Sequence, residues 1–335
     1  MEALMTEIMT EATASQSADI HIQPKNNKYD VLLRDLGQLR KIRELSQEEG
    51  SQLIRYLKYM GHMDVGERRQ PQDGRVFFQL ADREYELRLS TMANYQLLES
   101  MVVRLLYQED KELNQVGLDT IFSHLAKAYL QKKSGLIIFS GPVASGKTTT
   151  IYYLLRQVFQ KTKRQIICIE DPVEIREANF LQTEINDKAG IGFDQLIKAA
   201  LRHHPDILVI GEVRDVHTAR MMMRAALTGH LVVATIHAKN CFGVIERLKE
   251  LEVTDLQLHQ TLLLVSSQRL IPGIREVAWP VFEWLAGADL QTYLSDKQVT
   301  DNFRTLNQNI EQAVTDGKIS RAAAQPYRLE ETAKL

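Results

Sequence analysis

The stretch Gly141-Pro142-Val143-Ala144-Ser145-Gly146-Lys147-Thr148 matches the pattern Gly-x-x-x-x-Gly-Lys-Ser/Thr, and we call it the phosphate loop. It lies between a continuous apolar run, Gly135–Ser140, and a helical pattern, which is the context in which this motif binds nucleotides. Its small residues let backbone N–H groups turn toward phosphates, and the next helix presents its positive N-terminus to them. We therefore predict that Gly141 through Thr149 bind a nucleotide, with Lys147 at the β- and γ-phosphates and Thr148 at Mg²⁺.

Outward from the phosphate loop, short apolar runs alternate with helical patterns. Besides 135–140, such runs occupy residues 165–170, 206–211 and 231–236, and Ile121, Leu125 and Ala128 indicate a helix before the first of them. Unbroken apolar strands between helices favour a parallel sheet that is covered on both faces. We predict an α/β nucleotide-binding domain over residues 118–335, with a polar, helical C-terminal tail beyond about residue 289.

The first 107 residues have a different pattern, which predicts a smaller α+β domain. Ser46 and Glu49 form a capping box that opens a helix with Leu53, Leu57 and Met60 on one face. Alternating apolar and charged residues predict strands with one solvated face. The expected strands are 19–22, 28–34, 75–80, 84–90 and 101–107, with a turn at 24–27. The polar, acidic segment 108–117 is the predicted interdomain linker.

Carboxylates follow two of the apolar runs. Asp206-Ile-Leu-Val-Ile-Gly-Glu212 is a buried strand that ends in an acid, so Glu212 is expected to reach Mg²⁺ directly or through water. Glu170, Asp171 and Glu174 follow another strand, and three such carboxylates repel one another unless a cation or a water network offsets their charge. We expect one of them to orient the attacking water.

Histidines and arginines supply further candidates. His230 and His237 occur at the two ends of the run 231–236, and we predict that they sense the γ-phosphate. Arg75, Arg88 and Arg104 occur on predicted strands of the first domain. Charges on such strands usually face solvent, although an arginine supplied to a phosphoryl-transfer site can raise the rate by about 10³–10⁵.

Composition excludes several classes of protein. The chain has 335 residues, a net charge of -2 and 25% charged residues, so it has no basic excess for broad binding of nucleic acid. It has no basic leader and no apolar stretch near the ~20 residues that span a bilayer, so we expect a cytoplasmic protein that partners recruit. Cys168 and Cys241 are far apart in the sequence, which argues against a disulfide framework and against a zinc site.

The four motifs, in this order, resemble those of the secretion and pilus traffic ATPases. In that family they are the Walker A loop, aspartate box, Walker B motif and histidine box, here at 141–148, 170–174, 206–215 and 228–237. The resemblance extends back into the first domain through residues 18–24 and 71–75, so it covers roughly residues 15–285. Within the family the chain looks most like the ATPase of the competence pseudopilus, on residues 61–74 and 265–270. The absence of an added N-terminal domain, a tetracysteine insert and the retraction ATPases' C-terminal motif agrees with this likeness.

The resemblance implies a RecA-like ATPase domain after a PAS-like domain, and a homohexamer that hydrolyses ATP with Mg²⁺ and without zinc. Glu174 would be the catalytic glutamate, supported by Glu170 and Asp171, and Lys147 and Glu212 would complete the catalytic set. His230 and His237 would form the histidine box. Some of the first-domain arginines, here Arg75, Arg88 and Arg104, would reach a nucleotide in the ring.

The implied partners are a polytopic membrane platform protein and the pseudopilus machinery, on the inner face of the membrane, without sequence-specific binding of nucleic acid. Two positions depart from the family pattern. Ala144 fits only if that residue needs no positive φ, and His204 replaces a usual aspartate. A motor for type II secretion or for type IV pilus extension or retraction, a DNA-dependent motor and a nucleotide-gated scaffold without turnover remain alternatives.

Overall fold

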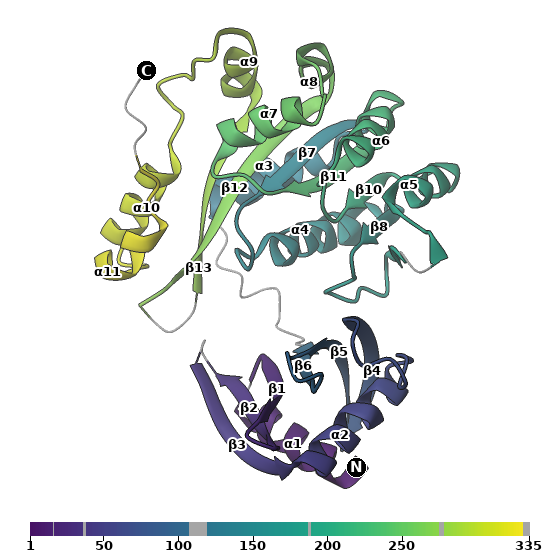
Figure 1. Ribbon diagram of the computed structural model, residues 1–335. Helices are drawn as coiled ribbons and strands as arrows, with labels where there is room; N and C mark the ends of the chain where they lie inside the picture. Colours follow the sequence, from purple (N-terminus) through teal and green to yellow (C-terminus); the bar gives the residue numbers. More distant parts are fainter. Residues whose placement is uncertain (16, 36–37, 107–118, 187–188, 275–277, 331–335) are drawn as a thin grey trace. The chain divides into compact units, whose positions relative to one another are not determined.

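The computed structural model describes residues 1–15, 17–35, 38–106, 119–186, 189–274 and 278–330. The chain divides into two compact units, Met1–Glu109 and Asp110–Leu335, which we call the first and second units and describe separately (Figure 1). The predicted linker at 108–117 lies outside the described residues. None of the described helices has the length and apolar character that a bilayer-spanning helix requires.

The first unit is a six-stranded antiparallel sheet with two helices. Its strand order is β3-β2-β1-β6-β5-β4, with β1 at Asp19–Lys25, β2 at Lys28–Asp35, β3 at Gln38–Ser46, β4 at Gln72–Leu80, β5 at Arg83–Ala93 and β6 at Glu99–Leu106. The helices are α1 (Glu2–Ala14) and α2 (Gln47–Met60). Strand β3 was not predicted, because its charged residues hide the strand pattern. The turn expected at 24–27 is shorter, since β1 extends to Lys25 and only Asn26 and Asn27 have positive φ there.

Helix α2 begins where the sequence predicted. Ser46 accepts a hydrogen bond from the Glu49 N–H, and Glu49 accepts one from the Ser46 N–H, so the capping box is confirmed. Leu53 and Leu57 are buried as expected, but Met60 is 36% exposed and Ile54 fills the core in its place. Both helices and all six strands contribute to one apolar core.

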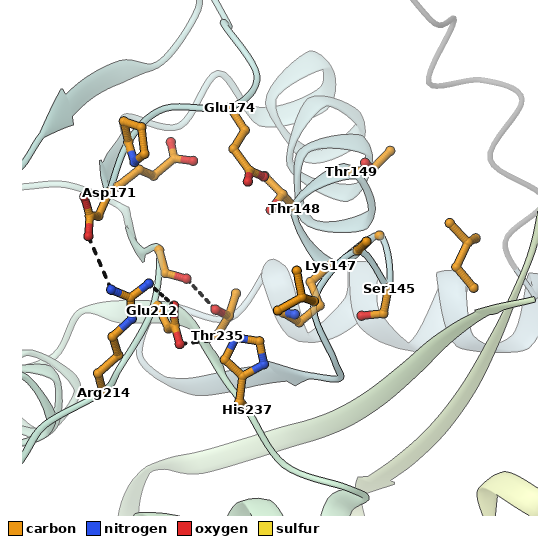
Figure 2. A pocket seen from close by; sticks show the side chains of 17 residues that line it. Ser145, Lys147, Thr148, Thr149, Asp171, Glu174, Glu212, Arg214, Thr235 and His237 are labelled. Carbon is orange, nitrogen blue, oxygen red and sulfur yellow. Dashed lines mark hydrogen bonds and ion pairs between the residues drawn. The ribbon is translucent and has the colours of Figure 1, made fainter. Parts of the chain in front are cut away.

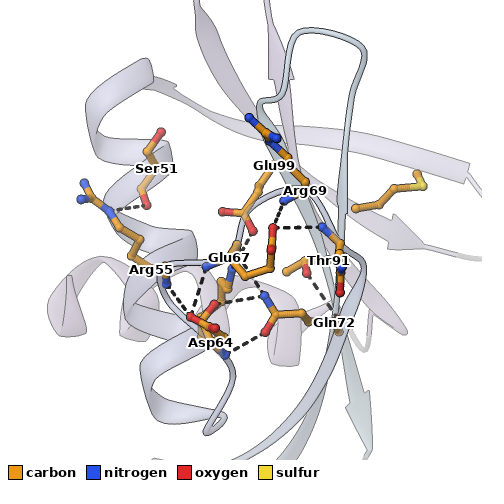
Figure 3. A network of polar contacts seen from close by, with 12 residues as sticks. Ser51, Arg55, Asp64, Glu67, Arg69, Gln72, Thr91 and Glu99 are labelled. Carbon is orange, nitrogen blue, oxygen red and sulfur yellow. Dashed lines mark hydrogen bonds and ion pairs between the residues drawn. The ribbon is translucent and has the colours of Figure 1, made fainter.

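A polar network holds the segment between α2 and β4 (Figure 3). The ammonium group of Lys58, which is fully buried, donates to the Glu99 carboxylate at 2.7 Å and to the Glu67 carbonyl at 2.5 Å. Asp64 accepts from the N–H groups of Gly66 and Glu67, and Gln72 donates to the carbonyls of Asp64 and Glu67. The buried ion pair and these bonds fix the path of the chain into β4.

The second unit contains a seven-stranded sheet whose order is β13-β12-β7-β11-β10-β8-β9. All neighbours are parallel except β12 and β13, which confirms a parallel-rich sheet. The strands are β7 (Gly135–Ser140), β8 (Ile166–Glu170), β9 (Leu181–Glu184), β10 (Ile207–Ile210), β11 (Leu231–Ile236), β12 (Leu262–Pro272) and β13 (Ala278–Ala286).

Helices cover both faces of this sheet, as the unbroken apolar strands predicted. Along β7, Leu136 and Ile138 pack into one apolar cluster, and Ile137 and Phe139 pack into the other. The first cluster includes α5 (Phe193–Arg202), α6 (Val216–Leu227), α7 (Cys241–Glu250), α8 (Asp255–Thr261) and α9 (Gly287–Asp296). The second includes α3 (Thr120–Leu130) and α4 (Lys147–Thr162). A third cluster joins the ends of β12 and β13 to α10 (Leu306–Thr315), α11 (Arg321–Ala324) and the 3₁₀ turn Gln325–Tyr327.

The helix predicted from Ile121, Leu125 and Ala128 is confirmed as α3, but its buried face is different. Ile121 is 71% exposed, and Phe122, which stacks on Phe282 at 4.2 Å, is buried instead.

The ends of the parallel strands define the edge of the sheet at which a ligand can bind. Because β7, β8, β10 and β11 are parallel, their carboxyl ends meet at one edge of the sheet, where open α/β folds bind ligands.

Candidate active site

The phosphate loop connects β7 to α4, as predicted. Its glycines have φ angles of 147° at Gly141 and 82° at Gly146, which favour glycine. Gly141 also has no room for a side chain, since a Cβ there would lie 2.5 Å from the Gln268 carbonyl oxygen. We expected alanine to fit position 144 only without a positive φ. That expectation is wrong, because Ala144 has a φ of 60° and therefore holds a left-handed conformation.

Lys147, the first residue of α4, points back over the loop. Its ammonium donates to the carbonyls of Gly141 at 3.0 Å and Pro142 at 2.9 Å. Burial lowers the pKa of Lys147, while the negative charges of Glu212 and Glu174 act to raise it. The lysine is thus half-buried and lies within electrostatic reach of both predicted acids.

A pocket of about 480 Å³ opens above the loop, which is a size typical of small-ligand sites (Figure 2). Side chains from four parallel strand ends and from the phosphate loop line it. The sequence-predicted residues that it brings together are Val143, Ala144, Ser145, Gly146, Lys147, Thr148, Thr149, Glu170, Asp171, Glu174, Glu212 and His237. Pro172, Gly211, Arg214, Thr235 and Leu270 complete its lining.

Glu212 follows β10 and both of its carboxylate oxygens are engaged. Oε2 pairs with Arg214 at 2.7 Å, and Oε1 lies 3.2 Å from His237 Nε2. Arg214 also reaches Asp171 at 3.4 Å, so it links the ends of β8 and β10 (Figure 2). The hydrogen bond from Arg214 to Glu212 raises the pKa of the guanidinium. The sequence analysis did not single out Arg214, although its position two residues after Glu212 was a usable signal.

The three aspartate-box acids lie in different surroundings. Glu170 is buried, its carboxylate accepts from the Tyr152 hydroxyl at 2.5 Å, and burial raises its pKa from 4.5 to about 7. Gln182 donates to the same hydroxyl at 2.6 Å. Neither Tyr152 nor Gln182 was predicted as a partner. In contrast, Glu174 extends into the pocket toward Thr148 (Figure 2), where a water above the phosphate loop could be oriented.

The structure separates the two predicted histidines. His237 lies in the pocket, with Nδ1 2.9 Å from the Gly141 carbonyl and Nε2 facing Glu212. His230 immediately precedes β11 and lies at the opposite end of that strand, where its Nδ1 is 3.4 Å from the Thr228 hydroxyl. Both histidines are among the described residues, and of the two only His237 lines the pocket.

The three candidate arginines belong to the first unit. Arg75 pairs with Glu86 at 3.1 Å, and Arg88 lies 4.0 Å from the same carboxylate. Arg104 pairs with Asp19 at 2.9 Å. All three occur on the central and edge strands β4, β5 and β6, and each already has an acidic neighbour.

The residues at this pocket suit a magnesium nucleotide. The Thr148 hydroxyl and the Glu212 carboxylate are oxygen donors, which Mg²⁺ prefers, and Mg²⁺ usually takes its other ligands from water and phosphates. The described residues contain no group of three or more histidines, cysteines or acids that could hold a metal ion by themselves. Helix α4 and Lys147 supply positive charge for phosphates.

Comparison with known proteins identifies similar chains of one family. The family model described as "Type II/IV secretion system protein" matches residues 1–314. The "Competence protein ComGA" of Streptococcus pneumoniae is 37% identical over 329 residues, covering 98% of this chain and 99% of that protein. The "Type II secretion system protein E" of Aeromonas hydrophila is 34% identical, over 80% of this chain and 54% of its own length. The solved structure "Pilus Retraction Motor PilT and Bound ADP" superposes with a TM-score of 0.80 and 25% identity, covering 97% of each chain.

Proposed function

Because this chain belongs to the type II/IV secretion system protein family, we propose that it is the motor ATPase that drives assembly of a competence pseudopilus for DNA uptake. The chain is an ATPase of the secretion type. The competence role is carried by one observation, the 37% identity to a competence protein over nearly the full length of both chains. The similarity to the type II secretion protein spans about half of that protein, which favours the competence role over secretion.

The proposed chemistry follows from the pocket. Lys147 exchanges the carbonyls of Gly141 and Pro142 for phosphate oxygens, and Glu174 orients the attacking water. Thr148 and Glu212 would hold Mg²⁺, which when bound neutralises charge on the phosphates. Catalysis then depends on positioning and on electrostatic stabilisation by these fixed groups.

A deletion strain scored for DNA uptake tests this role. Wild-type chain should restore transformation, and Lys147→Ala should not, because the phosphates lose their main point charge. Lys133→Ala is the matched control, since this exposed lysine precedes β7 at the opposite end of the strand from the phosphate loop. Normal transformation with Lys147→Ala would defeat the motor hypothesis. Intact transformation in the deletion strain would redirect the proposal to secretion or to pilus extension or retraction.

Purified protein separates the remaining alternatives. Steady-state phosphate release should be measurable and should depend little on DNA. Strong stimulation by DNA would support a motor that grips nucleic acid, and absence of release would support a nucleotide-gated scaffold.

We further propose a homohexamer, in which the RecA-like second unit binds ATP and a PAS-like first unit contacts a neighbouring subunit's nucleotide. The ring would dock on a polytopic platform protein at the cytoplasmic face of the membrane. If Arg75 acts across a subunit boundary, mixing Arg75→Ala chains with Lys147→Ala chains should restore some turnover, because a mixed ring can contain one intact site. No recovery in mixed rings that demonstrably form would count against this arrangement.

A further inference from the structure

Two segments flank Gly141, the first residue of the phosphate loop. On one side, β12 passes so close that a Cβ on Gly141 would lie 2.5 Å from the Gln268 carbonyl oxygen. On the other side, His237 Nδ1 lies 2.9 Å from the Gly141 carbonyl oxygen. The loop that follows β11 is also tied to Ser140, whose hydroxyl accepts from the Ala238 N–H at 3.1 Å. The start of the phosphate loop is therefore held between β12 and the segment that carries His237.

Arg269 of β12 joins these two flanking segments to each other. Its Nη2 donates to the Lys239 carbonyl at 2.5 Å, and its Nη1 donates to the Gln268 carbonyl at 3.0 Å. The residue is only 6% exposed. Gly141, His237, Lys239, Arg269 and Gln268 therefore form a closed circuit of contacts around the loop that binds phosphates.

The guanidinium of Arg269 makes hydrogen bonds to main-chain carbonyls rather than an ion pair. Burial lowers its pKa, and the charge of Glu283 acts in the opposite direction. No carboxylate among the described residues lies within ion-pair distance of Arg269, and Glu283 instead accepts the N–H groups of Cys241 and Leu306, each at 2.7 Å. A planar guanidinium can hold two carbonyls in a fixed mutual geometry, which an ammonium cannot reproduce.

We propose that Arg269 is a positioning residue for ATP hydrolysis, because it fixes the segment bearing His237 against the phosphate loop. This inference rests on the proposed ATPase mechanism. With Arg269 in place, His237 lies between the Gly141 carbonyl and Glu212. Without it, Lys239 and Gln268 lose their common donor, and the segment that carries His237 loses this tie to the strand beside the phosphate loop.

Arg164 provides a matched control. Its guanidinium also donates to main-chain carbonyls, those of Leu130, Gln131 and Lys132, at 2.9, 2.5 and 2.9 Å. It precedes β8, so it lies at the amino end of the parallel strands, away from the pocket. Arg164→Gln therefore removes the same kind of hydrogen bond without touching the circuit around Gly141.

The test compares Arg269→Gln, Arg269→Lys and Arg164→Gln in the full chain by thermal stability, kcat and KM for ATP. Both glutamine variants should lose stability. Only Arg269→Gln should lower kcat by tenfold or more in the folded protein, with Arg269→Lys intermediate and Arg164→Gln within twofold of wild type. If Arg269→Gln does not fold, Arg269→Lys decides, since it keeps the charge and loses the planar fork.

A double variant distinguishes a positioning role that acts through His237 from a purely structural role. If Arg269 acts through His237, then Arg269→Gln combined with His237→Ala should have the kcat of His237→Ala alone. Losses that multiply, or a wild-type kcat in Arg269→Gln, would overturn the inference while leaving the ATPase intact. A wild-type chain without turnover would instead overturn the proposed function, and the inference with it.

Discussion

Replacing Ala144 by glycine should stabilise the second unit. Ala144 has a φ of 60°, and the left-handed conformation costs a non-glycine residue about 1–2 kcal/mol. Its methyl group is exposed, so its removal sacrifices no apolar packing. Glycine increases the conformational entropy of the unfolded chain, which offsets about 0.4–1 kcal/mol. We therefore expect a net gain of about 0.5–1 kcal/mol in the free energy of unfolding, or about 1–4 °C in Tm for a unit of this size.

Tryptophan fluorescence during urea unfolding isolates this effect. The chain has 2 tryptophans, Trp279 and Trp284, and both belong to the second unit. Ala128→Gly is the matched control, because it removes the same methyl group from an exposed position inside helix α3. It should destabilise by about 1 kcal/mol, since glycine is a poor helix former. If Ala144→Gly destabilises the protein as Ala128→Gly does, the strain assigned to the phosphate loop is refuted.

Three further predictions concern buried or catalytic charge. Glu174→Gln should still bind a fluorescent ATP analogue but release phosphate at least tenfold more slowly, because it cannot accept a proton from the attacking water; wild-type release would remove Glu174 from that role. Burial raises the pKa of Glu170 from its ordinary 4.5 to about 7, so the folded chain binds this proton more tightly than the unfolded chain does. The resulting contribution to stability is fully present below pH 4.5 and is lost as the pH rises through 7. Glu170→Gln should remove this loss of roughly 3 kcal/mol between pH 4.5 and 8 in urea unfolding, and an unchanged pH dependence would contradict the assignment. Lys58→Ala should destabilise the first unit by about 3–5 kcal/mol, because it leaves Glu99 buried and unpaired. The double variant Lys58→Met with Glu99→Leu removes both charges and should be nearly neutral. Hydrogen exchange of the β6 amides measures both variants, and equal losses of stability would contradict the reasoning.

Local sequence patterns predicted the parts of this site that depend on neighbours in the chain. The strand Gly135–Ser140, the phosphate loop and helix α4 are one continuous segment, and the acid after β10 follows directly from the apolar run before it. The structure further places Glu212 beside His237, because the parallel strands β10 and β11 end at one edge of the sheet.

Contacts between distant segments could not be predicted in the same way. Tyr152 looks like a core residue of α4, and only the folded chain shows its hydroxyl on Glu170. In the sequence, Arg269 was only one residue of the stretch 265–270 that carries the family likeness, and its partner Lys239 is 30 residues away. Hydrogen bonds of this kind depend on strand order and register, which single-sequence periodicity does not determine.

The geometry of Glu212 explains how one acid can be held in place and still serve a magnesium nucleotide. An ionised carboxylate has about four lone-pair positions, and the Arg214 guanidinium occupies one of them on Oε2. The other positions remain available to a metal ion or to its water ligands. Because Arg214 also pairs with Asp171, the Glu212 carboxylate is oriented by a group that is itself held at the end of β8, and the His237 ring lies beside the other carboxylate oxygen. Glu212 therefore needs little reorganisation when a nucleotide binds, which is the condition under which fixed charges contribute most to phosphoryl transfer.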